Sequence, residues 1–200
     1  MKTIALLALI TASVLAQEVV PLDEAQRGAR KVTDTLGTPS DAPFATDVDL
    51  SKPQAIRAGK VGFLIIPDKK LSLETLGSAS ESVTPLGQLW TLNVSLGKNG
   101  EAVPNDKLRF LTVADGEKDL QVQLYFVGVA KNAEGKLDLV VFAKDKEPLV
   151  RVALAKSATT TTQELPIELS GRKDDDQTGT LSLRVLGQYA ADLTVKRPAE

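Results

Sequence analysis

The chain has 200 residues, of which 42% are hydrophobic and 25% charged, and its formal net charge is −2 at neutral pH. This composition is typical of a folded protein with a core, and the nearly balanced charge offers no basic surface for nucleic acid. The sequence contains no cysteine and no histidine, which excludes disulfides, thiolate and imidazole metal sites, and nucleophiles activated by histidine. Carboxylates, lysine, tyrosine and hydroxyl groups remain as the side chains that could carry a reaction.

The first 16 residues have the pattern of a secretory signal peptide. Lys2 supplies a positive charge, Ile4 to Leu15 form a short apolar run, and a cleavage site follows between Ala16 and Gln17. The run is too short to span a bilayer, and no later segment approaches roughly 20 apolar residues. We therefore expect an exported protein without a transmembrane segment, periplasmic or extracellular, and the lack of disulfides favours a bacterial source. A retained N-terminal anchor or a buried helix is the alternative.

Residues 17–58 show no sustained hydrophobic period, and prolines are interspersed among Asp, Thr and Gly. This composition predicts a linker or a loosely ordered tail. A short helix from Asp23 to Lys31 is compatible with Pro21 and with the acidic residues at its start, but Gly28 interrupts it and a clear apolar stripe is missing. A tail that becomes ordered by docking on the following domain is the alternative.

From residue 59 to residue 200, short apolar runs separated by turn residues predict one β-domain. The run Val61–Ile66 is continuously apolar, which predicts a strand buried on both faces. The mixed segment 69–87 predicts a long connection. Residues 89–96 then alternate, which predicts a strand with Trp90 on its core face and the intervening polar residues in water.

Turn residues indicate the register of the next hairpins. The Asn-Gly pair at 99–100 favours a tight turn that places Leu96 opposite Val103. At the following Asp-Gly pair, a three-residue loop places Phe110 opposite Val122 and so matches two apolar faces. We therefore prefer the three-residue loop to a two-residue turn at that position.

Residues 120–155 predict three consecutive antiparallel strands. A four-residue loop between the second and third strands places Leu139 opposite Val152 and keeps the charged residue of the third strand in water. The first strand begins with a polar face that includes Gln123, and its second half is apolar on both faces, as in a central strand. Tyr125 is in phase with that polar face, which makes it the candidate for an exposed aromatic ring.

The C-terminal part predicts an edge strand and a last hairpin. The edge strand is Glu164–Leu169, because Pro166 cannot donate to a ladder. A three-residue loop at 186–188 pairs Leu183 with Ala191. About eight or nine short strands without a long helical pattern predict an all-β, antiparallel β-sandwich, immunoglobulin-like or related.

One acidic segment resembles a metal-binding loop. Asp174, Asp176 and Thr178 alternate ahead of Gly179, and oxygen ligands at this spacing can surround a calcium ion. Val185 stands where a helix-loop-helix calcium site requires a glutamate. We therefore expect a solvated hairpin loop and no cofactor, with calcium bound at these three residues as the alternative.

No pattern identifies a reaction or a catalytic residue. Paired carboxylates that are distant in sequence can meet in space and cleave glycosides. The candidates in or near predicted strands are Asp138, Glu164, Glu168 and Asp192. Acidic side chains on the hydrated face of a strand usually serve solubility, so we assign no catalytic role to them.

The leading hypothesis is a non-enzymatic, exported β-sandwich that serves as a binding, assembly or surface-associated module. Its partner, an unknown protein or polysaccharide, would contact loops or a free sheet edge near Pro166. A carboxylate-dependent hydrolase on the same scaffold is the second hypothesis, and a calcium-stabilised module is the third.

Overall fold

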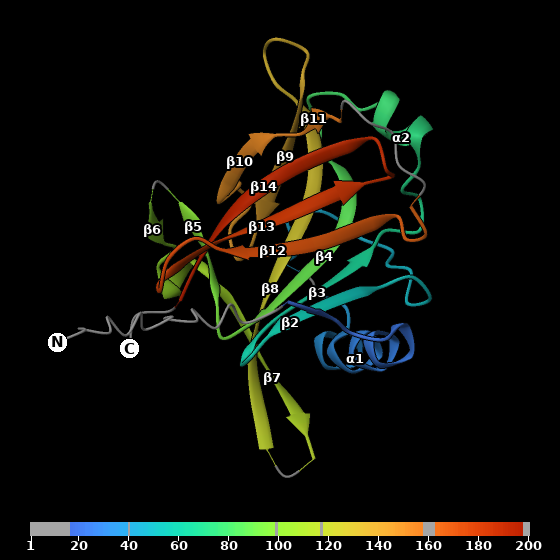
Figure 1. The fold of residues 1–200 in the computed structure, drawn as a ribbon. Coiled ribbons are helices and arrows are strands. Elements are labelled where there is room, and N and C mark those ends of the chain that lie inside the picture. Colours follow the sequence, from blue (N-terminus) through green and yellow to red (C-terminus); the bar gives the residue numbers. More distant parts are fainter. Residues whose placement is uncertain (1–16, 40, 99, 117, 158–162, 198–200) are drawn as a thin grey trace, which may run out of the picture.

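The computed structural model describes residues 17–39, 41–98, 100–116, 118–157 and 163–197, so the expected signal peptide lies outside the described residues. The described residues form fourteen strands, two α-helices and one 3-10 helix. Their strands pair in antiparallel fashion and make two sheets that face each other (Figure 1). This arrangement confirms the predicted all-β sandwich.

The larger sheet has eight strands in the order β1-β2-β3-β4-β8-β9-β10, with β7 paired to β8. The long strand β8 lies at its centre, because β4 pairs with one edge of β8 while β7 and β9 share the other. In Figure 1 the β7–β8 hairpin extends beyond the sandwich. The bounds are β1 Glu18–Val19, β2 Gln54–Ala58, β3 Val61–Pro67, β4 Thr84–Leu92, β7 Arg109–Asp115, β8 Lys118–Lys131, β9 Leu137–Phe142 and β10 Val150–Ala153.

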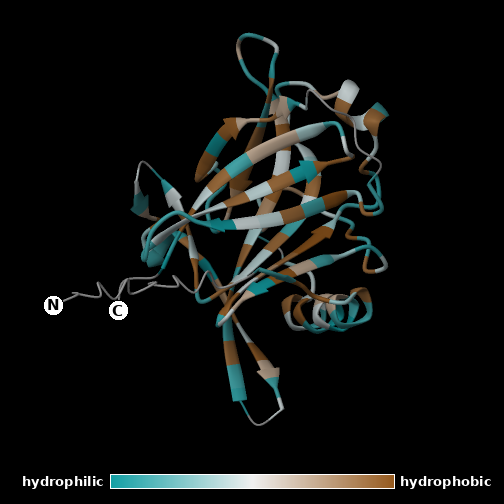
Figure 2. Cartoon of the chain, viewed as in Figure 1, coloured by the Kyte–Doolittle hydropathy of each residue, from teal (hydrophilic) through white to brown (hydrophobic). Residues whose placement is uncertain are grey.

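The smaller sheet has six strands in the order β12-β13-β14-β5-β6, with β11 paired to β14. Hydrophobic and hydrophilic residues alternate along β12, β13 and β14 (Figure 2), as expected for strands with one buried face. None of the helices within the described ranges is long and apolar enough to cross a membrane. The bounds are β5 Ser95–Lys98, β6 Glu101–Ala102, β11 Ala155–Lys156, β12 Ile167–Lys173, β13 Thr178–Val185, β14 Tyr189–Lys196, α1 Leu22–Leu36, α2 Leu73–Gly77 and the 3-10 helix Asn105–Lys107.

Apolar clusters lie on both faces of the larger sheet. The inner cluster fills the space between the sheets and includes Ile65 and Leu183, whereas the outer cluster includes Ile66 and Phe126. Consecutive residues of β3 therefore point into different clusters. This confirms that the run Val61–Ile66 is a strand buried on both faces.

The expected linker at 17–58 contains ordered elements that cover the outer face of the larger sheet. Helix α1 buries Ala25, Ala29 and Val32, which follow one another at helical spacing. Two of the three are alanines, so the stripe is only weakly apolar in the sequence. After the helix, Phe44 packs edge-to-face on Phe126, with ring centroids 6.0 Å apart.

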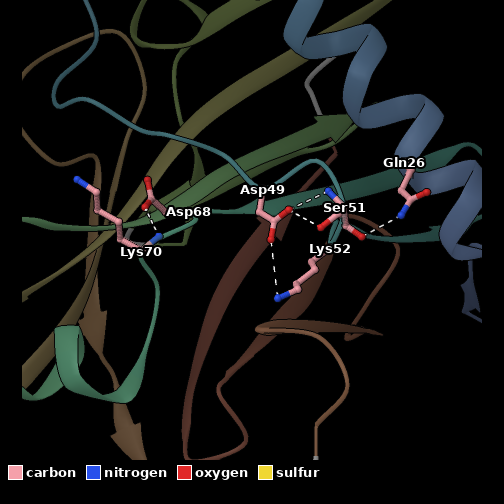
Figure 3. A network of polar contacts seen from close by, with 6 residues as sticks. All are labelled: Gln26, Asp49, Ser51, Lys52, Asp68 and Lys70. Carbon is pink, nitrogen blue, oxygen red and sulfur yellow. Dashed lines mark hydrogen bonds and ion pairs between the residues drawn. The ribbon is translucent and has the colours of Figure 1, made fainter.

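A polar network holds this covering segment in place (Figure 3). Gln26 of α1 donates to the backbone oxygen of Ser51 at 2.9 Å, and Ser51 donates through its backbone N–H and its hydroxyl to Asp49 Oδ1. The buried carboxylate of Asp68, at the end of β3, accepts the backbone N–H groups of Asp47 (2.8 Å) and Lys70 (2.9 Å). Because its oxygens accept these hydrogen bonds, the carboxylate of Asp68 can be buried.

The predicted residue pairs of three hairpins are confirmed. Leu139 pairs with Val152 in the β9–β10 hairpin, and Leu183 pairs with Ala191 in the β13–β14 hairpin. In the β5–β6 hairpin, the backbone N–H of Val103 donates to the oxygen of the residue predicted to face it, Leu96, at 3.0 Å. Asn99 of that turn lies outside the described residues.

The predicted register of the β7–β8 hairpin is wrong by one residue. Asp115 pairs with Lys118, which leaves a two-residue turn and places Leu111, not Phe110, opposite Val122. The ladder also sets Arg109 opposite Leu124.

This register is compatible with a charged residue because the side chain of Arg109 has partners. Its guanidinium pairs with the carboxylate of Asp41 at 3.0 Å and lies 5.9 Å from the centre of the Phe126 ring. The register therefore depends on Asp41, whose contact with β7 cannot be predicted from the hairpin alone.

The predicted strand 89–96 is two strands in different sheets. Strand β4 ends at Leu92 in the larger sheet, and β5 begins at Ser95 in the smaller one. Asn93, between them, has φ +57°, a conformation that asparagine tolerates better than most residues. Trp90 is buried as predicted, but in the outer cluster, whereas Leu96 belongs to the inner one.

Side chains expected in water form a buried polar network beside this crossover. Gln123 and Tyr125 face the inner side of the larger sheet, and the tyrosine is fully buried, so its predicted exposure is wrong. Tyr125 donates its hydroxyl proton to Gln123 Oε1 (2.6 Å) and accepts the Leu96 N–H (3.2 Å). Gln123 Nε2 donates to Ser95 Oγ at 2.8 Å. The network joins the two sheets, since β8 belongs to one and β5 to the other.

Burial raises the pKa of Tyr125 to about 12, and the hydrogen bond from the Leu96 N–H opposes this effect. The unfolded phenol ionises near pH 10, so the stability from the neutral phenol is complete below about pH 10 and is lost as the pH rises through about 12. We expect the free energy of unfolding, measured by urea titration, to fall over this interval in the wild type and to stay flatter in Tyr125→Phe. Equal slopes would contradict this assignment.

Candidate functional site

The acidic segment singled out in the sequence is the loop of the β12–β13 hairpin. Asp175 Oδ1 accepts hydrogen bonds from the backbone N–H groups of Gln177 (2.7 Å) and Thr178 (2.6 Å), and Thr178 begins β13. These bonds lower the pKa of Asp175 because they favour its charged form. The segment is a solvent-exposed turn whose backbone is held by an aspartate side chain.

The two aspartates proposed as calcium ligands already have separate partners. Asp174 accepts a hydrogen bond from Thr180 Oγ1 (2.6 Å) and pairs with Arg172 Nε (2.8 Å), whereas Asp176 pairs with Lys173 Nζ (2.5 Å). These contacts lower the pKa of both carboxyl groups. In the part of the chain that the structure describes, no three carboxylate side chains gather as a metal site.

The four carboxylates considered for hydrolysis occupy different parts of the sandwich. Asp138 lies on β9 of the larger sheet and pairs with Arg151 at 3.2 Å. Glu168 lies on β12 and Asp192 on β14, with β13 between them, and Glu164 precedes β12. None of the four lines either of the two clefts described next.

A cleft of about 440 Å³ opens between the two sheets, with β2 and β3 on one side and β12 and β13 on the other. Its size is within the range of small-molecule sites. Gly171 of β12 widens it: a Cβ at this position would lie 3.7 Å from Ile56 Cδ1 and 3.4 Å from Gln17 Oε1. The floor is apolar and consists of Ile56, Ala58, Val61, Phe63, Val94 and Val195.

The rim of this inter-sheet cleft is charged. Its lining includes two more basic than acidic side chains, namely Arg57, Arg172, Lys173 and Arg197 against Asp175 and Asp176. Arg57 of β2 also pairs with Glu18 of β1 at 2.8 Å and with Glu24 of α1 at 3.4 Å. Among the described residues Arg197 forms no ion pair, although its positive charge contributes to lowering the pKa of Asp176 on the same rim. Its guanidinium is therefore the rim cation without a direct ion-pair partner.

The neighbouring sheet edge is occupied by glutamine side chains. Strand β12 is an edge strand, as predicted, but it runs from Ile167 to Lys173, so Pro166 precedes it and does not lie within it as expected. Its Leu169 N–H donates to Gln54 Oε1, and its Gly171 N–H donates to Gln17 Oε1. Strand addition at this edge would therefore have to displace both glutamines.

A second groove, of about 490 Å³, lies between α1 and the outer face of the larger sheet. Gly28 faces it, and a Cβ at Gly28 would meet no atom within 4 Å. Lys31 of α1 pairs with Asp115 of β7 at 2.8 Å beside it. The indole N–H of Trp90, which also lines the groove, has no acceptor within the described part of the chain. Its apolar lining includes Ala25, Val32, Leu64, Leu92 and Val122.

Sequence reasoning missed the inter-sheet cleft. Its residues come from β2, β3, the β4–β5 crossover and the three C-terminal strands, and only the tertiary fold brings them together. Glycines at 171 and 179 lie outside the predicted strands, but in the structure they belong to β12 and β13, where an isolated glycine indicates a bulge or a close approach. At Gly179, a Cβ would lie 2.8 Å from the Arg172 oxygen.

Comparisons of the chain with protein-family models, with curated proteins and with solved structures give no match.

Proposed function

We propose that the protein is an exported, non-enzymatic binding module whose inter-sheet cleft takes a small amphipathic ligand with an apolar body and an anionic group. The observation that carries this proposal is an apolar floor, open between two sheets, beneath a rim with an excess of basic side chains. The export part rests on residues 1–16, whose sequence has the charge, apolar run and cleavage site of a signal peptide.

The floor favours an apolar body because its side chains are held in place by the inner core. Ile56, Phe63, Val94 and Val195 all belong to the cluster that joins the sheets. A ligand that covers such a surface gains roughly 25 cal/mol for each Å² of apolar area removed from water. A preformed floor also spares the ligand the cost of ordering the protein.

The rim favours an anionic group. Arg197 has no ion pair with a described residue, and Arg172 and Lys173 of β12 line the same opening. A guanidinium matches the planar geometry of carboxylate, sulfonate and phosphate oxygens. The ligand class is therefore an apolar molecule with one such group at its end.

An extended polysaccharide fits these residues less well. Carbohydrate platforms rely on exposed aromatic rings, whereas Trp90 and Tyr125 are both buried. Phe63, the aromatic residue that lines the cleft, is nine-tenths buried in its floor.

The test is a fluorescence titration with anilinonaphthalene sulfonate, an apolar probe with an anionic group. We expect saturable binding to the wild type and a loss of affinity of about tenfold or more in Gly171→Leu, whose side chain fills the cleft. Arg197→Gln should weaken the anionic probe roughly threefold and leave a neutral apolar dye unchanged. Gly77→Leu is the matched control, because a Cβ at Gly77 meets no atom within 4 Å and the residue lies outside the cleft.

Two results would contradict the proposal. Equal affinity in the wild type and in a folded Gly171→Leu variant would place the probe outside the cleft. An equal loss in Gly171→Leu and Gly77→Leu would mean that the probe reports a general loosening of the fold.

A further inference from the structure

Gln17 has an unusual position at the mouth of the inter-sheet cleft. Its side-chain oxygen accepts the N–H of Gly171 on the edge of β12, and Gln17 also lines the cleft. The next residue, Glu18, pairs with Arg57 at 2.8 Å and so fixes the chain directly after it. The side-chain nitrogen of Gln17 donates no hydrogen bond to a described residue. The fold therefore uses the oxygen of this amide and leaves its nitrogen free.

The expected cleavage after Ala16 makes Gln17 the first residue of the mature chain. A glutamine with a free α-amine can cyclise: its α-nitrogen attacks Cδ and forms a new C–N bond. The bond between Cδ and Nε2 then breaks, and Nε2 leaves as ammonia with a proton from the α-nitrogen. No oxidant, reductant or further reactant is needed.

We propose that Gln17 is a modification site at which the mature chain ends in pyroglutamate. The inference rests on the proposed export, because cyclisation needs the α-amine that cleavage creates. The Gly171 N–H donates to Oε1, the atom on which negative charge develops when Cδ is attacked. The lactam keeps this oxygen and loses only the nitrogen that the fold does not use, so we expect the lactam oxygen to accept the same bond from β12.

Cyclisation also changes the electrostatics of the cleft. A free N-terminus would place an ammonium group at a mouth already lined by Arg57, Arg172 and Arg197. The lactam nitrogen carries no charge. The cyclised chain therefore presents only side-chain cations to an anionic ligand.

The test uses the full chain expressed in a bacterium that exports it, purified from the exported fraction and incubated at neutral pH. Intact-mass measurement and peptide mapping should show a chain that starts at residue 17 and has lost one ammonia. Hydrogen exchange of the Gly171 amide should be roughly tenfold slower in this chain than in Gln17→Ala, which cannot cyclise and has no oxygen to accept the bond.

The outcomes separate the two proposals. A chain that starts at residue 17 with an intact glutamine refutes the cyclisation and leaves export standing. A chain that starts elsewhere refutes the modification at this site, and a chain that keeps its first 16 residues refutes export as well. Equal exchange at Gly171 in the wild type and in Gln17→Ala would refute the role assigned to the side-chain oxygen, whatever the mass shows.

Discussion

Replacement of Gly87 by alanine is expected to lower the free energy of unfolding by about 4 kcal/mol and the melting temperature by roughly 10 °C. Gly87 has φ +149° and lies at an irregularity of β4, where the pairing with β8 shifts register. A Cβ there would overlap the backbone oxygen of Ile66 and lie 2.9 Å from the Cα of Pro67. The neighbouring strand β3 would have to move, and it is packed on both faces.

The matched control is Gly62→Ala, on β3 of the same sheet. A Cβ at Gly62 would lie 3.6 Å from Leu92 Cβ, an ordinary contact, so its stability should stay within about 0.5 kcal/mol of the wild type. Both variants are compared by thermal melting followed by circular dichroism. If Gly87→Ala melted within about 2 °C of Gly62→Ala, the close approach of β3 and β4 at this point would be wrong.

Replacement of Gln123 by alanine is expected to cost about 3 kcal/mol of stability, because it leaves buried polar groups without partners. The hydroxyl of Tyr125 would lose its acceptor, and Ser95 Oγ would lose its donor. Both residues are buried between the sheets, where water does not replace the lost bonds. The measurement is the free energy of unfolding from urea titration, at a pH well below 10.

Gln121→Ala provides the control, since Gln121 lies two residues earlier on β8 and is exposed. It should change stability by less than about 0.5 kcal/mol. A comparable loss of stability in the two variants would show that the effect comes from the lower strand propensity of alanine in β8 and not from the buried network.

The strand pairing of a hairpin was predictable where only one loop length, odd or even, keeps the apolar side chains of both strands on the same face. In the β9–β10 hairpin, a loop of the wrong parity would have turned Arg151 into the core, so the apolar pattern alone selected the pairing of Leu139 with Val152. The β7–β8 hairpin lacks this constraint, because Asp41 and the Phe126 ring accommodate Arg109 from outside the hairpin.

The alternation of polar and apolar residues along a strand could not predict which of them face the smaller sheet and which face the outer cover. Gln123 and Thr91 lie directly opposite each other on β8 and β4, and both are buried between the sheets. Their apolar neighbours face α1 and the segment after it, so the larger sheet is covered twice. For residues 17–58, the sequence predicted a docked cover only as the alternative to a linker, because the buried stripe of α1 consists mainly of alanine.

The inter-sheet cleft could not be predicted because it depends on contacts between distant parts of the chain. Gln17 and Gly171 meet across 154 positions, and Gln54 and Leu169 across 115. The acidic segment at its rim was predicted as a solvated hairpin loop, with calcium binding as the alternative, and it is the loop of the β12–β13 hairpin. Its carboxylates instead pair with basic side chains of the same hairpin.

The crossover at Asn93 and Val94 joins a central strand of one sheet to the other sheet through only two residues. Two residues span so short a distance that the two sheets cannot move apart at this point while β4 and β5 both keep their strand pairing. We therefore expect that unfolding of either sheet removes the apolar surface against which the other packs. The sandwich should unfold as one cooperative unit rather than as two independently folding halves.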